Sequence, residues 1–420
     1  QLTCLTCKFA QNKSKMIPFS PPRIDKEIVD EVSRALLSGW ITTGPRTKEF
    51  EKMLTNYGGH ASTLCVSSAS AGLELVLRWY GVKEGDEVIL PSYTYAATAN
   101  VVVHCGAKPV MVDSGDDFNI SIEAIRKAIT PRTKVIMPVD IGGLPCDYLA
   151  INALVNEPEI KRYFVPGNAE QTALGRILVL SDAAHSIGGI LWGKSVGNLT
   201  DISVYSFHAV KNLTTAEGGA ICLNLPDPFD NGKVYAILNT KSLHGQNKDA
   251  LAKTKVGGWQ YDIVEAGYKC NMTDLQAAIG LIELKRYDQD MLVRRKKIFD
   301  RYAEAFSNDS RFIVPVYELD EKISSYHVFM LRLSIEDESF RDAVIQEIFK
   351  REVAVNVHFK PLPMMSFYKK LGYQMSNYPV AYRNYIREIS LPVYYDLTDE
   401  QVEKVIEVVK ESYNVALSNN

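Results

Sequence analysis

The sequence lacks the features that would point to a membrane, to secretion or to nucleic acid. In its 420 residues, no apolar run reaches the ~18 residues that a membrane-spanning helix requires. The first fifteen residues, QLTCLTCKFAQNKSK, contain no apolar segment of the kind that secretory signal peptides carry. The formal net charge is −3, so no excess of positive charge favours nucleic acid or an anionic membrane. We therefore expect a cytoplasmic protein with no nucleic-acid or membrane partner.

Cysteine is also scarce. The chain has seven cysteines, an odd and scattered set that indicates reduced thiols rather than a disulfide framework. Cys4 and Cys7 form a lone CxxC pair with no second pair of ligands nearby. No metal site is therefore expected, and a zinc or redox role for this pair is the alternative. Residues 1–15 are predicted to form a poorly ordered tail, and the folded part is expected to begin at residue 16.

Short apolar strands alternate with helical patterns between about residues 60 and 225. The predicted strands are 63–66, 86–91, 108–113, 134–139, 176–182, 202–208 and 218–224. Strands of this length that are joined by helices indicate a mostly parallel sheet covered on both faces. The sequence therefore predicts an α/β fold whose large domain has a seven-stranded, mainly parallel sheet. In such sheets, ligands bind beyond the carboxyl ends of the strands.

The second part of the chain has a different pattern. A long helix is predicted over 273–306, with Thr273 as its N-cap. Beyond it, strands at 326–335 and 353–359 and helices at 338–352 and 398–413 predict a smaller α+β domain. The expected division is a large domain at 16–272, followed at 273–420 by the connecting helix and the small domain. Residues 155–175 form a long polar connection that either reshapes the ligand site or decorates the surface.

Polar residues fall where predicted strands end. Ser68 and Ser70 lie between the strand at 63–66 and the next helix, where a helix N-terminus offers N–H groups and hydroxyls to a phosphate. This turn is neither a Walker A nor a G-x-G-x-x-G motif, so simple helix capping by serine is the alternative. Asp182 ends its strand and either points toward the ligand edge of the sheet or caps the following helix.

Lys211 follows the next strand, in the run SFHAVKNLTTAEGGA, where no helical charge pattern surrounds it. A partly desolvated lysine has a lowered pKa and can act as an amine nucleophile, whereas a solvated loop lysine is the ordinary alternative. In chain order, a phosphate cup, the aromatic cluster SYTYAATAN, Asp182 and Lys211 match the needs of pyridoxal 5′-phosphate. Its phosphate needs hydrogen-bond donors, its aldehyde a lysine, its pyridine nitrogen a carboxylate, and its ring an aromatic partner.

Seven stretches in order carry a resemblance to a known family. They are GWITTGPRTKEFE, SSASAGLELVL, GDEVILPSYTYAATANVV, SDAAHSIGG, YSFHAVKNLTTAEGGA, GYKCNMTDLQAAIGLIEL and VHFKPL. Together they resemble the DegT-type sugar aminotransferases, a branch of the fold type I superfamily of aspartate aminotransferase. The resemblance extends from about Ile17 to the C-terminal helix. Relatives that dehydrate deoxysugars carry histidine where this chain has Lys211, so the lysine favours transamination.

The resemblance implies a role for each matching residue around the cofactor. Lys211 would hold the cofactor as a Schiff base and move a proton between its C4′ atom and the substrate carbon. Asp182 would pair with the pyridine nitrogen. His185 would sit near the ring hydroxyl, and Tyr95 would stack on the ring.

The same resemblance implies the phosphate ligands and the oligomer. Ser70 and Ala71 would hold the phosphate through their backbone N–H groups, and Ser206 would hold it through its hydroxyl. Asn271 would reach the phosphate of the neighbouring subunit's cofactor. That role requires a homodimer with shared active sites.

The sequence indicates the residues of the substrate site less clearly than those of the cofactor site. The resemblance makes Thr43, His327 and His358 candidates for the sugar site, although a histidine on a strand is more often a structural residue. Many relatives carry a histidine in the segment that reads PVDIGGLPCD here, where this chain has Asp140. This departure would affect the mouth of the substrate site.

The resemblance also implies the reaction. The expected activity is transfer of an amino group, with glutamate as the expected donor, to a nucleotide-linked keto-deoxysugar. The product would serve a polysaccharide pathway, such as that of lipopolysaccharide or another surface glycan. One alternative is a catalytically idle relative that binds a ligand as a regulatory module, which the intact Lys211 and Asp182 argue against. Another is a fold type I lyase or an amino-cyclitol aminotransferase.

Overall fold

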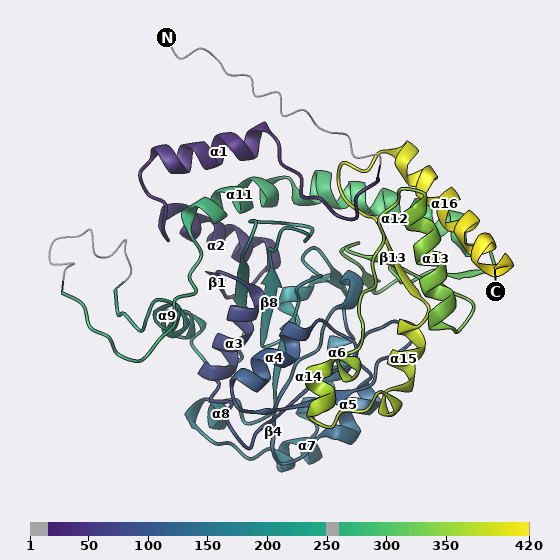
Figure 1. Ribbon diagram of the computed structural model, residues 1–420. Coiled ribbons are helices and arrows are strands. Elements are labelled where there is room, and N and C mark those ends of the chain that lie inside the picture. The colour runs from purple at the N-terminus through teal and green to yellow at the C-terminus, as the bar shows by residue number, and fades with distance from the viewer. Residues whose placement is uncertain (1–15, 249–259, 420) are drawn as a thin grey trace, which may run out of the picture.

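The computed structural model describes residues 16–248 and 260–419. The tail predicted at 1–15 therefore lies outside the described residues. Figure 1 shows an α/β body beside a group of C-terminal helices, with the first helix lying along the helix α11 that begins the second part of the chain.

The body is built on a seven-stranded sheet of order β1-β9-β8-β5-β4-β2-β3. The strands are β1 (Ser62–Val66), β2 (Glu87–Pro91), β3 (Lys108–Val112), β4 (Thr133–Ile136), β5 (Leu178–Asp182), β8 (Ile202–Ser206) and β9 (Gly219–Leu223). Strand β9 runs antiparallel to both of its neighbours, and the remaining pairings are parallel. The prediction of a seven-stranded, mainly parallel sheet is confirmed, because each predicted strand corresponds to an observed one.

Helices precede, connect and follow these strands. They are α1 (Lys26–Leu37), α2 (Pro45–Gly58), α3 (Ala69–Trp79), α4 (Ala96–His104), α5 (Ile122–Ala128), α6 (Tyr148–Asn156) and α9 (Asn231–Ser242). Short polar side chains begin several of them by accepting a backbone hydrogen bond, as Ser68 does for α3, Ser121 for α5 and Asp147 for α6. Helices α3 and α4 lie side by side against the sheet.

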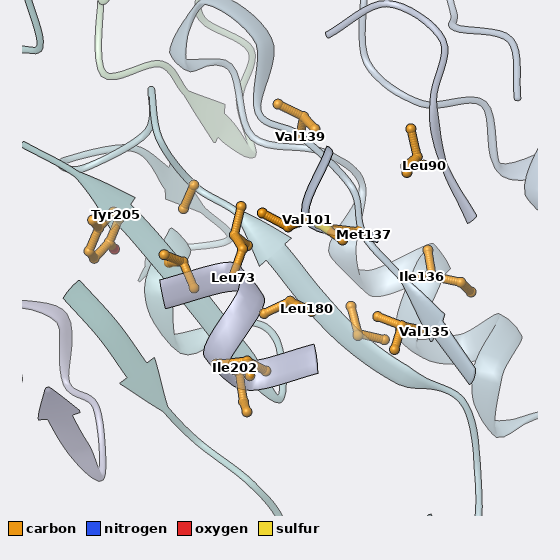
Figure 2. Close-up of a cluster of buried hydrophobic side chains, with 14 of the residues drawn as sticks. Leu73, Leu90, Val101, Val135, Ile136, Met137, Val139, Leu180, Ile202 and Tyr205 are labelled. Carbon is orange, nitrogen blue, oxygen red and sulfur yellow. The ribbon is translucent and has the colours of Figure 1, made fainter. Parts of the chain in front are cut away.

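The large core lies between these helices and the sheet. Figure 2 shows Leu73 of α3 and Val101 of α4 above Leu180 of β5 and Ile202 of β8. The four side chains are at most 1% exposed. Full burial of such a side chain contributes roughly 1.5–3 kcal/mol, so the strands that carry the polar residues at their ends are held rigidly.

The connection at 155–175 is not the irregular loop that its polar sequence suggests. It contains α7 (Pro158–Tyr163) and α8 (Ala169–Leu174). Gln171 is buried and donates a 2.9 Å hydrogen bond from Nε2 to the carbonyl of Tyr80. Gly175 caps the end of α8, and Arg176 then leads into β5, so the segment ends at the amino end of that strand. None of the residues that line the cavity described below comes from it, which favours the decorative interpretation.

The long helix predicted at 273–306 is interrupted. Helix α11 (Asp274–Lys285) begins with a capping box, in which Thr273 and Gln276 bond reciprocally to each other's backbone N–H groups. A π-helical turn at 287–291 then separates α11 from α12 (Leu292–Ser307). The predicted Thr273 cap is confirmed, whereas the continuous helix is wrong.

The C-terminal region contains further small sheets and helices. Its elements are β10 (Phe312–Ile313), β11 (Lys322–Ile323), β12 (Phe329–Leu333), α13 (Glu338–Lys350), α14 (Ser366–Lys370), α15 (Pro379–Tyr385), β13 (Glu388–Leu391) and α16 (Asp399–Ser418). One sheet has the order β10-β12-β13. Strand β11 joins β6 (Ile190–Leu191) and β7 (Lys194–Ser195) in another.

The strand predicted at 353–359 is not formed. The segment makes only isolated bridges, from Val353 to Ile17 and from Asn356 to Ser390. The strand that pairs with β12 is instead β13, which the sequence analysis did not single out. A separate hydrophobic cluster holds α12, α13, α16, β12 and β13 together and also takes in Ile17 from the N-terminal arm. The division of the chain at residue 272 stays a prediction.

Candidate active site

A cavity of about 330 Å³ opens at the carboxyl edge of the parallel strands. Its wall comes from the segments that follow β1, β2, β4, β5 and β8, from the residues just before β9, from the N-terminal arm and from the C-terminal region. The predicted site residues that line it are Ser70, Tyr95, Asp182, His185, Ser206, Lys211, His327 and His358. Chain topology therefore gathers in one cavity eight residues that are spread over almost 290 positions.

The first wall is the turn from β1 into α3. Ser68 caps the helix, and its Oγ accepts a 3.1 Å hydrogen bond from the backbone N–H of Ala71. Ser70 is exposed at the cavity, whereas Ala71 does not line it. A Cβ atom at Gly219 would lie 2.6 Å from backbone atoms of this turn, so only glycine lets β9 approach it so closely. The resulting helix N-terminus is suited to a phosphate.

Asp182 is the last residue of β5 and is buried. Its Oδ2 accepts a 2.8 Å hydrogen bond from Oγ1 of Thr98 on α4, and its Oδ1 accepts a 3.3 Å bond from the N–H of Ala184. Burial raises the pKa of the Asp182 carboxyl, while the bond from Thr98 and the positive charge of Lys211 oppose that shift. A cationic N–H placed beside this carboxylate would be stabilised.

Lys211 follows β8 and is half-buried. Burial lowers the pKa of its amine to about 8, and the negative charge of Asp182 opposes the shift. Among the residues that the structure describes, no hydrogen-bond acceptor is found for its Nζ atom. The amine is therefore available to a ligand in the cavity, and with a pKa of about 8 roughly a tenth of it is unprotonated at pH 7.

Ser206 and Tyr95 also line the cavity. Ser206 ends β8, is buried, and accepts a 3.4 Å hydrogen bond from the N–H of His208. Tyr95 precedes α4 and is 65% exposed, with its ring 6.0 Å from that of Phe359. An exposed ring at the wall of a cavity is free to stack on a planar ligand.

Histidines form the wall beside the C-terminal region. The His185 and His327 rings are buried, and their centroids are 4.4 Å apart. Phe359 stacks on His185 with 5.7 Å between centroids. The Nδ1 atom of His185 is buried without a hydrogen-bond partner among the described residues. Burial, the charge of Lys211 and the neighbouring His358 hold the pKa of His185 well below its usual range, so this imidazole is neutral.

Asn212 fixes the position of His327. Its Nδ2 donates a 2.6 Å hydrogen bond to the carbonyl of Ser325, so its Oδ1 must face Nδ1 of His327 at 2.7 Å. The Nδ1 atom of His327 therefore carries the proton, and its Nε2 atom carries a lone pair. Burial and the nearby His185 and Lys211 keep the pKa of His327 well below its usual range.

His358 is half-buried at the cavity, and its Nδ1 atom lies 2.8 Å from Oγ of Ser390 on β13. Burial and the charge of Lys211 lower the pKa of His358 to about 4. All three histidines are therefore neutral near pH 7. They offer the cavity hydrogen bonds without positive charge.

Two of the predicted site residues, Thr43 and Asn271, lie outside the cavity. Thr43 donates a 2.5 Å hydrogen bond to the carbonyl of Met272, and Asn271 donates a 2.6 Å bond to Oγ1 of Thr43. Neither side chain lines the cavity of its own chain. The structure thus brings these two together but does not bring them to Lys211.

Asp140, which was expected to affect the substrate mouth, does not line the cavity. The side chain is fully buried, and it accepts hydrogen bonds from the N–H of Cys146, the hydroxyl of Tyr148 and the hydroxyl of Ser186, at 2.8, 2.6 and 2.6 Å. Burial raises the pKa of this carboxyl against those bonds. Its role is to tie the 140–148 segment to the turn that carries His185.

Several residues at the site were missed by the sequence analysis. Thr98 was not identifiable, because nothing in its helix indicates a partner that lies 84 positions away. Asn212 directly follows Lys211, and Phe359 directly follows His358. Their position next to predicted site residues in the sequence was the only indication that they belong to the site.

Within the described part of the chain, no group of three or more histidine, cysteine, aspartate or glutamate side chains is arranged to hold a metal ion. In the same residues, no helix has both the length and the hydropathy to cross a bilayer.

The site fits pyridoxal 5′-phosphate on its own chemistry. A helix N-terminus with hydroxyls, a buried carboxylate and an amine with lowered pKa surround one cavity, and the orphaned Nδ1 of His185 needs a polar ligand atom. A model of the DegT/DnrJ/EryC1/StrS aminotransferase family matches residues 22–164 and 169–410. The chain belongs to this family. The unmatched residues between those two segments lie in the connection at 155–175.

Several relatives resemble this aminotransferase over its whole length. A protein of Streptococcus pneumoniae designated a sugar aminotransferase, solved in its PMP-form, is 44% identical with a TM-score of 0.92 and covers 95% of this chain and 100% of its own. Its PLP-form gives 42% identity and a TM-score of 0.91, with coverage of 96% and 99%.

Two further relatives carry more specific names. The spore coat polysaccharide biosynthesis protein SpsC of Bacillus subtilis is 35% identical, with coverage of 96% of this chain and 98% of its own. PseC of Helicobacter pylori, an aminotransferase involved in the biosynthesis of pseudoaminic acid, is 26% identical with a TM-score of 0.83, and covers 95% of this chain and 100% of its own. The expected family, fold class, aminotransferase activity and pyridoxal-phosphate cofactor are confirmed.

Proposed function

We propose that this aminotransferase acts in the cytoplasm on a nucleotide-linked keto-deoxysugar and takes its amino group from glutamate. The amino sugar would enter the biosynthesis of a polysaccharide or surface glycan. The observation that carries this proposal is the amine of Lys211, with its pKa lowered to about 8, in one cavity with Asp182 and three neutral histidines.

The sugar is supported by the polarity of the cavity. Sugar hydroxyls are satisfied by neutral hydrogen-bonding groups of the kind that these histidines offer. Burial keeps the pKa values of His185, His327 and His358 below the usual histidine range, which leaves these groups neutral. The polysaccharide pathway is supported by the names of the SpsC and PseC relatives.

Different residues of the chain would bind the cofactor and move protons. Pyridoxal phosphate, when bound, supplies an electron sink for the transfer of the amino group. The N-terminus of α3, Ser70 and Ser206 would hold its phosphate, and Asp182 would hold a proton at its pyridine nitrogen. Tyr95 would cover one face of its ring. Lys211 would move a proton between the substrate carbon and the C4′ atom of the cofactor, a task suited to an amine with a pKa of about 8.

A homodimer with shared active sites is part of the proposal. Asn271 and Thr43 lie together outside the cavity of their own chain, so they are free to serve the cavity of a partner. Side chains around this pair include Lys269, whose Nζ donates a 2.5 Å hydrogen bond to Oδ1 of Asn271. A cation and an amide at this position would suit the phosphate of a cofactor held by the partner subunit.

The test is the absorption spectrum of the purified protein with pyridoxal phosphate, before and after glutamate is added. The expected result is a visible band that glutamate removes and that a nucleotide-linked keto-sugar restores. In Lys211→Ala the cofactor should not become covalently attached on borohydride reduction, and turnover should fall at least a thousandfold. The variant Lys233→Ala, at an exposed lysine of α9, is the control. A visible band that glutamate leaves unchanged would refute glutamate as donor, and wild-type turnover in Lys211→Ala would refute the assignment.

A further inference from the structure

A buried carboxylate, that of Glu388, contacts the backbone of His358. Glu388, on β13, is fully buried. Its Oε2 accepts a 2.9 Å hydrogen bond from the backbone N–H of His358, and its Oε1 lies 2.5 Å from Oγ of Ser390. The same Oγ lies 2.8 Å from Nδ1 of His358. Glu388, Ser390 and His358 therefore form one continuous chain of hydrogen bonds that ends at the cavity.

The directions of these hydrogen bonds depend on one another. A serine hydroxyl has a single proton, so it can donate to Glu388 or to His358 but not to both. When Glu388 is ionised, Ser390 must donate to it and must accept from Nδ1–H of His358. The Nε2 atom of His358 then carries a lone pair. When Glu388 is protonated, it donates to Ser390, Ser390 donates to Nδ1, and Nε2 carries the proton.

We propose that Glu388 is a positioning residue that decides, through the hydroxyl of Ser390, which nitrogen of His358 carries the proton. The position of this proton sets whether His358 accepts a hydrogen bond from a substrate hydroxyl or donates one to a substrate oxygen. The part that concerns the substrate rests on the proposed sugar substrate. The part that concerns the proton on His358 does not, because it follows from the three side chains alone.

The groups around Glu388 are consistent with two accessible states. Arg332 of β12 and Arg341 of α13 lower its pKa through their charges, as do the bonds from Ser390 and His358, and the buried phenol of Tyr93 also faces it. Burial outweighs these effects and raises the pKa of Glu388 to about 8. His358 stays neutral over the same range because its pKa is lowered to about 4. It therefore holds one proton, whose position Glu388 selects.

A single isosteric substitution distinguishes the two states. In Glu388→Gln, the amide oxygen must accept from the N–H of His358, because the reverse orientation would place two donors face to face. The amide nitrogen then donates to Ser390, and Ser390 donates to Nδ1. Glu388→Gln should therefore hold His358 with its proton on Nε2 at every pH, as protonated Glu388 does.

The direct measurement is ¹⁵N NMR of the holoenzyme labelled at its seven histidines, with the signals of His358 identified by their loss in His358→Gln. In the wild type, the proton of His358 should move from Nε2 to Nδ1 as the pH rises through about 8. Glu388→Gln should keep the proton on Nε2 from pH 6.5 to 9.5. Ser390→Ala, which removes the connecting hydroxyl, should abolish the pH dependence. A tautomer that is the same in all three proteins at every pH would overturn the proposal.

A kinetic measurement tests whether the tautomer of His358 affects the reaction of the keto-sugar. At pH 6.5, Glu388→Gln should match the wild type in kcat/KM for the keto-sugar, and at pH 9 the two should differ by about tenfold, the effect of one hydrogen bond. The half-reaction with the amino donor should be unchanged at both values. Glu51→Gln, a buried carboxylate of α2 bonded to the N–H of Cys65, is the matched control and should follow the wild type.

The NMR and kinetic measurements distinguish a failure of the proposed keto-sugar substrate from a failure of the positioning role of Glu388. If no keto-sugar is turned over but the tautomer of His358 follows Glu388, the proposed substrate is wrong and the positioning role stands. If a keto-sugar is turned over and Glu388→Gln matches the wild type at pH 9 as well as at pH 6.5, the positioning role is wrong and the proposed function stands.

Discussion

Thr98, in the first turns of α4, donates a 2.8 Å hydrogen bond from Oγ1 to Oδ2 of Asp182, at the end of β5. Both side chains are buried, and Oγ1 of Thr94 lies a further 2.9 Å from Oγ1 of Thr98. A helix that follows β2 thus orients the carboxylate that ends β5, across the parallel edge of the sheet. The bond also favours the ionised form of Asp182 against the effect of burial.

Replacement of Thr98 by valine should weaken cofactor binding while leaving the fold intact. Valine has the shape of threonine but no hydroxyl, so the pKa of Asp182 should rise further and the carboxylate should hold a cationic pyridine nitrogen less well. We expect the Kd for pyridoxal phosphate to rise by about tenfold. Titration of the apoprotein by absorbance measures this value. Thr63→Val, at a buried threonine of β1, is the control, and an equal effect in both variants would contradict the prediction.

Asn212 should matter for the sugar more than for the amino donor. Asn212→Leu removes both the bond to Ser325 and the bond to Nδ1 of His327, so this ring loses its fixed orientation and tautomer. We expect kcat/KM for the keto-sugar to fall by about tenfold or more. The half-reaction with glutamate, followed by stopped-flow absorbance, should change less than threefold by the same reasoning.

The matched control for that variant is Asn224→Leu. Asn224 likewise uses both ends of its amide, accepting from the N–H of Ala61 and donating to the carbonyl of Gly197, but neither partner is a histidine of the cavity. Equal losses in both half-reactions of Asn212→Leu would show that the residue supports the fold and does not act through His327.

His60 should make the protein sensitive to mild acid although it lies outside the cavity. Burial lowers its pKa to about 4 in the folded protein, below the value of about 6.5 in an unfolded chain. The unfolded state therefore binds the extra proton first, and stability that is present above pH 6.5 is lost as the pH falls toward 4. Between pH 7 and 5 this group should cost about 2 kcal/mol.

Urea unfolding of the wild type and His60→Gln at pH 7 and pH 5 measures this contribution. The variant should lose less stability on acidification, by about the amount given above for this group. His104→Gln, at an exposed histidine of α4, controls for the removal of a histidine from the surface. An unchanged pH dependence in His60→Gln would contradict the prediction.

Shared active sites predict that two defective proteins complement each other. Lys211→Ala removes a residue from one subunit's cavity, and Asn271→Ala removes one that should serve the partner's cavity. When the two are mixed after reversible dissociation, each mixed dimer should contain one intact site, so about a quarter of wild-type activity should return. A mixture of Lys211→Ala with Asp182→Ala should stay inactive, because both changes affect the same subunit's part of its cavity. Equal behaviour of the two mixtures would argue against shared sites.

Local sequence alone was sufficient for the sheet and for the residues at its edge. Each short apolar segment between residues 60 and 225 formed a strand, because a strand buried on both faces is recognisable by its own composition. The positions of Asp182 and Lys211 followed directly, since the carboxyl ends of parallel strands meet at one edge. Thr273 was likewise identifiable as an N-cap, because capping depends only on neighbouring backbone groups.

Tertiary contacts decided what the local pattern left open. Residues 353–359 have the composition of a strand, but β13 takes the place beside β12 and leaves them only isolated bridges, to Ile17 and to Ser390. Asp140 was expected to affect the substrate mouth, yet its three hydrogen bonds hold it in the interior. The sequence by itself determined which strands form and which reactive groups end them. Only the tertiary structure decided which distant side chains orient those groups, as Thr98, Asn212 and Glu388 do, because such hydrogen bonds depend on the packing of elements that are far apart in the chain.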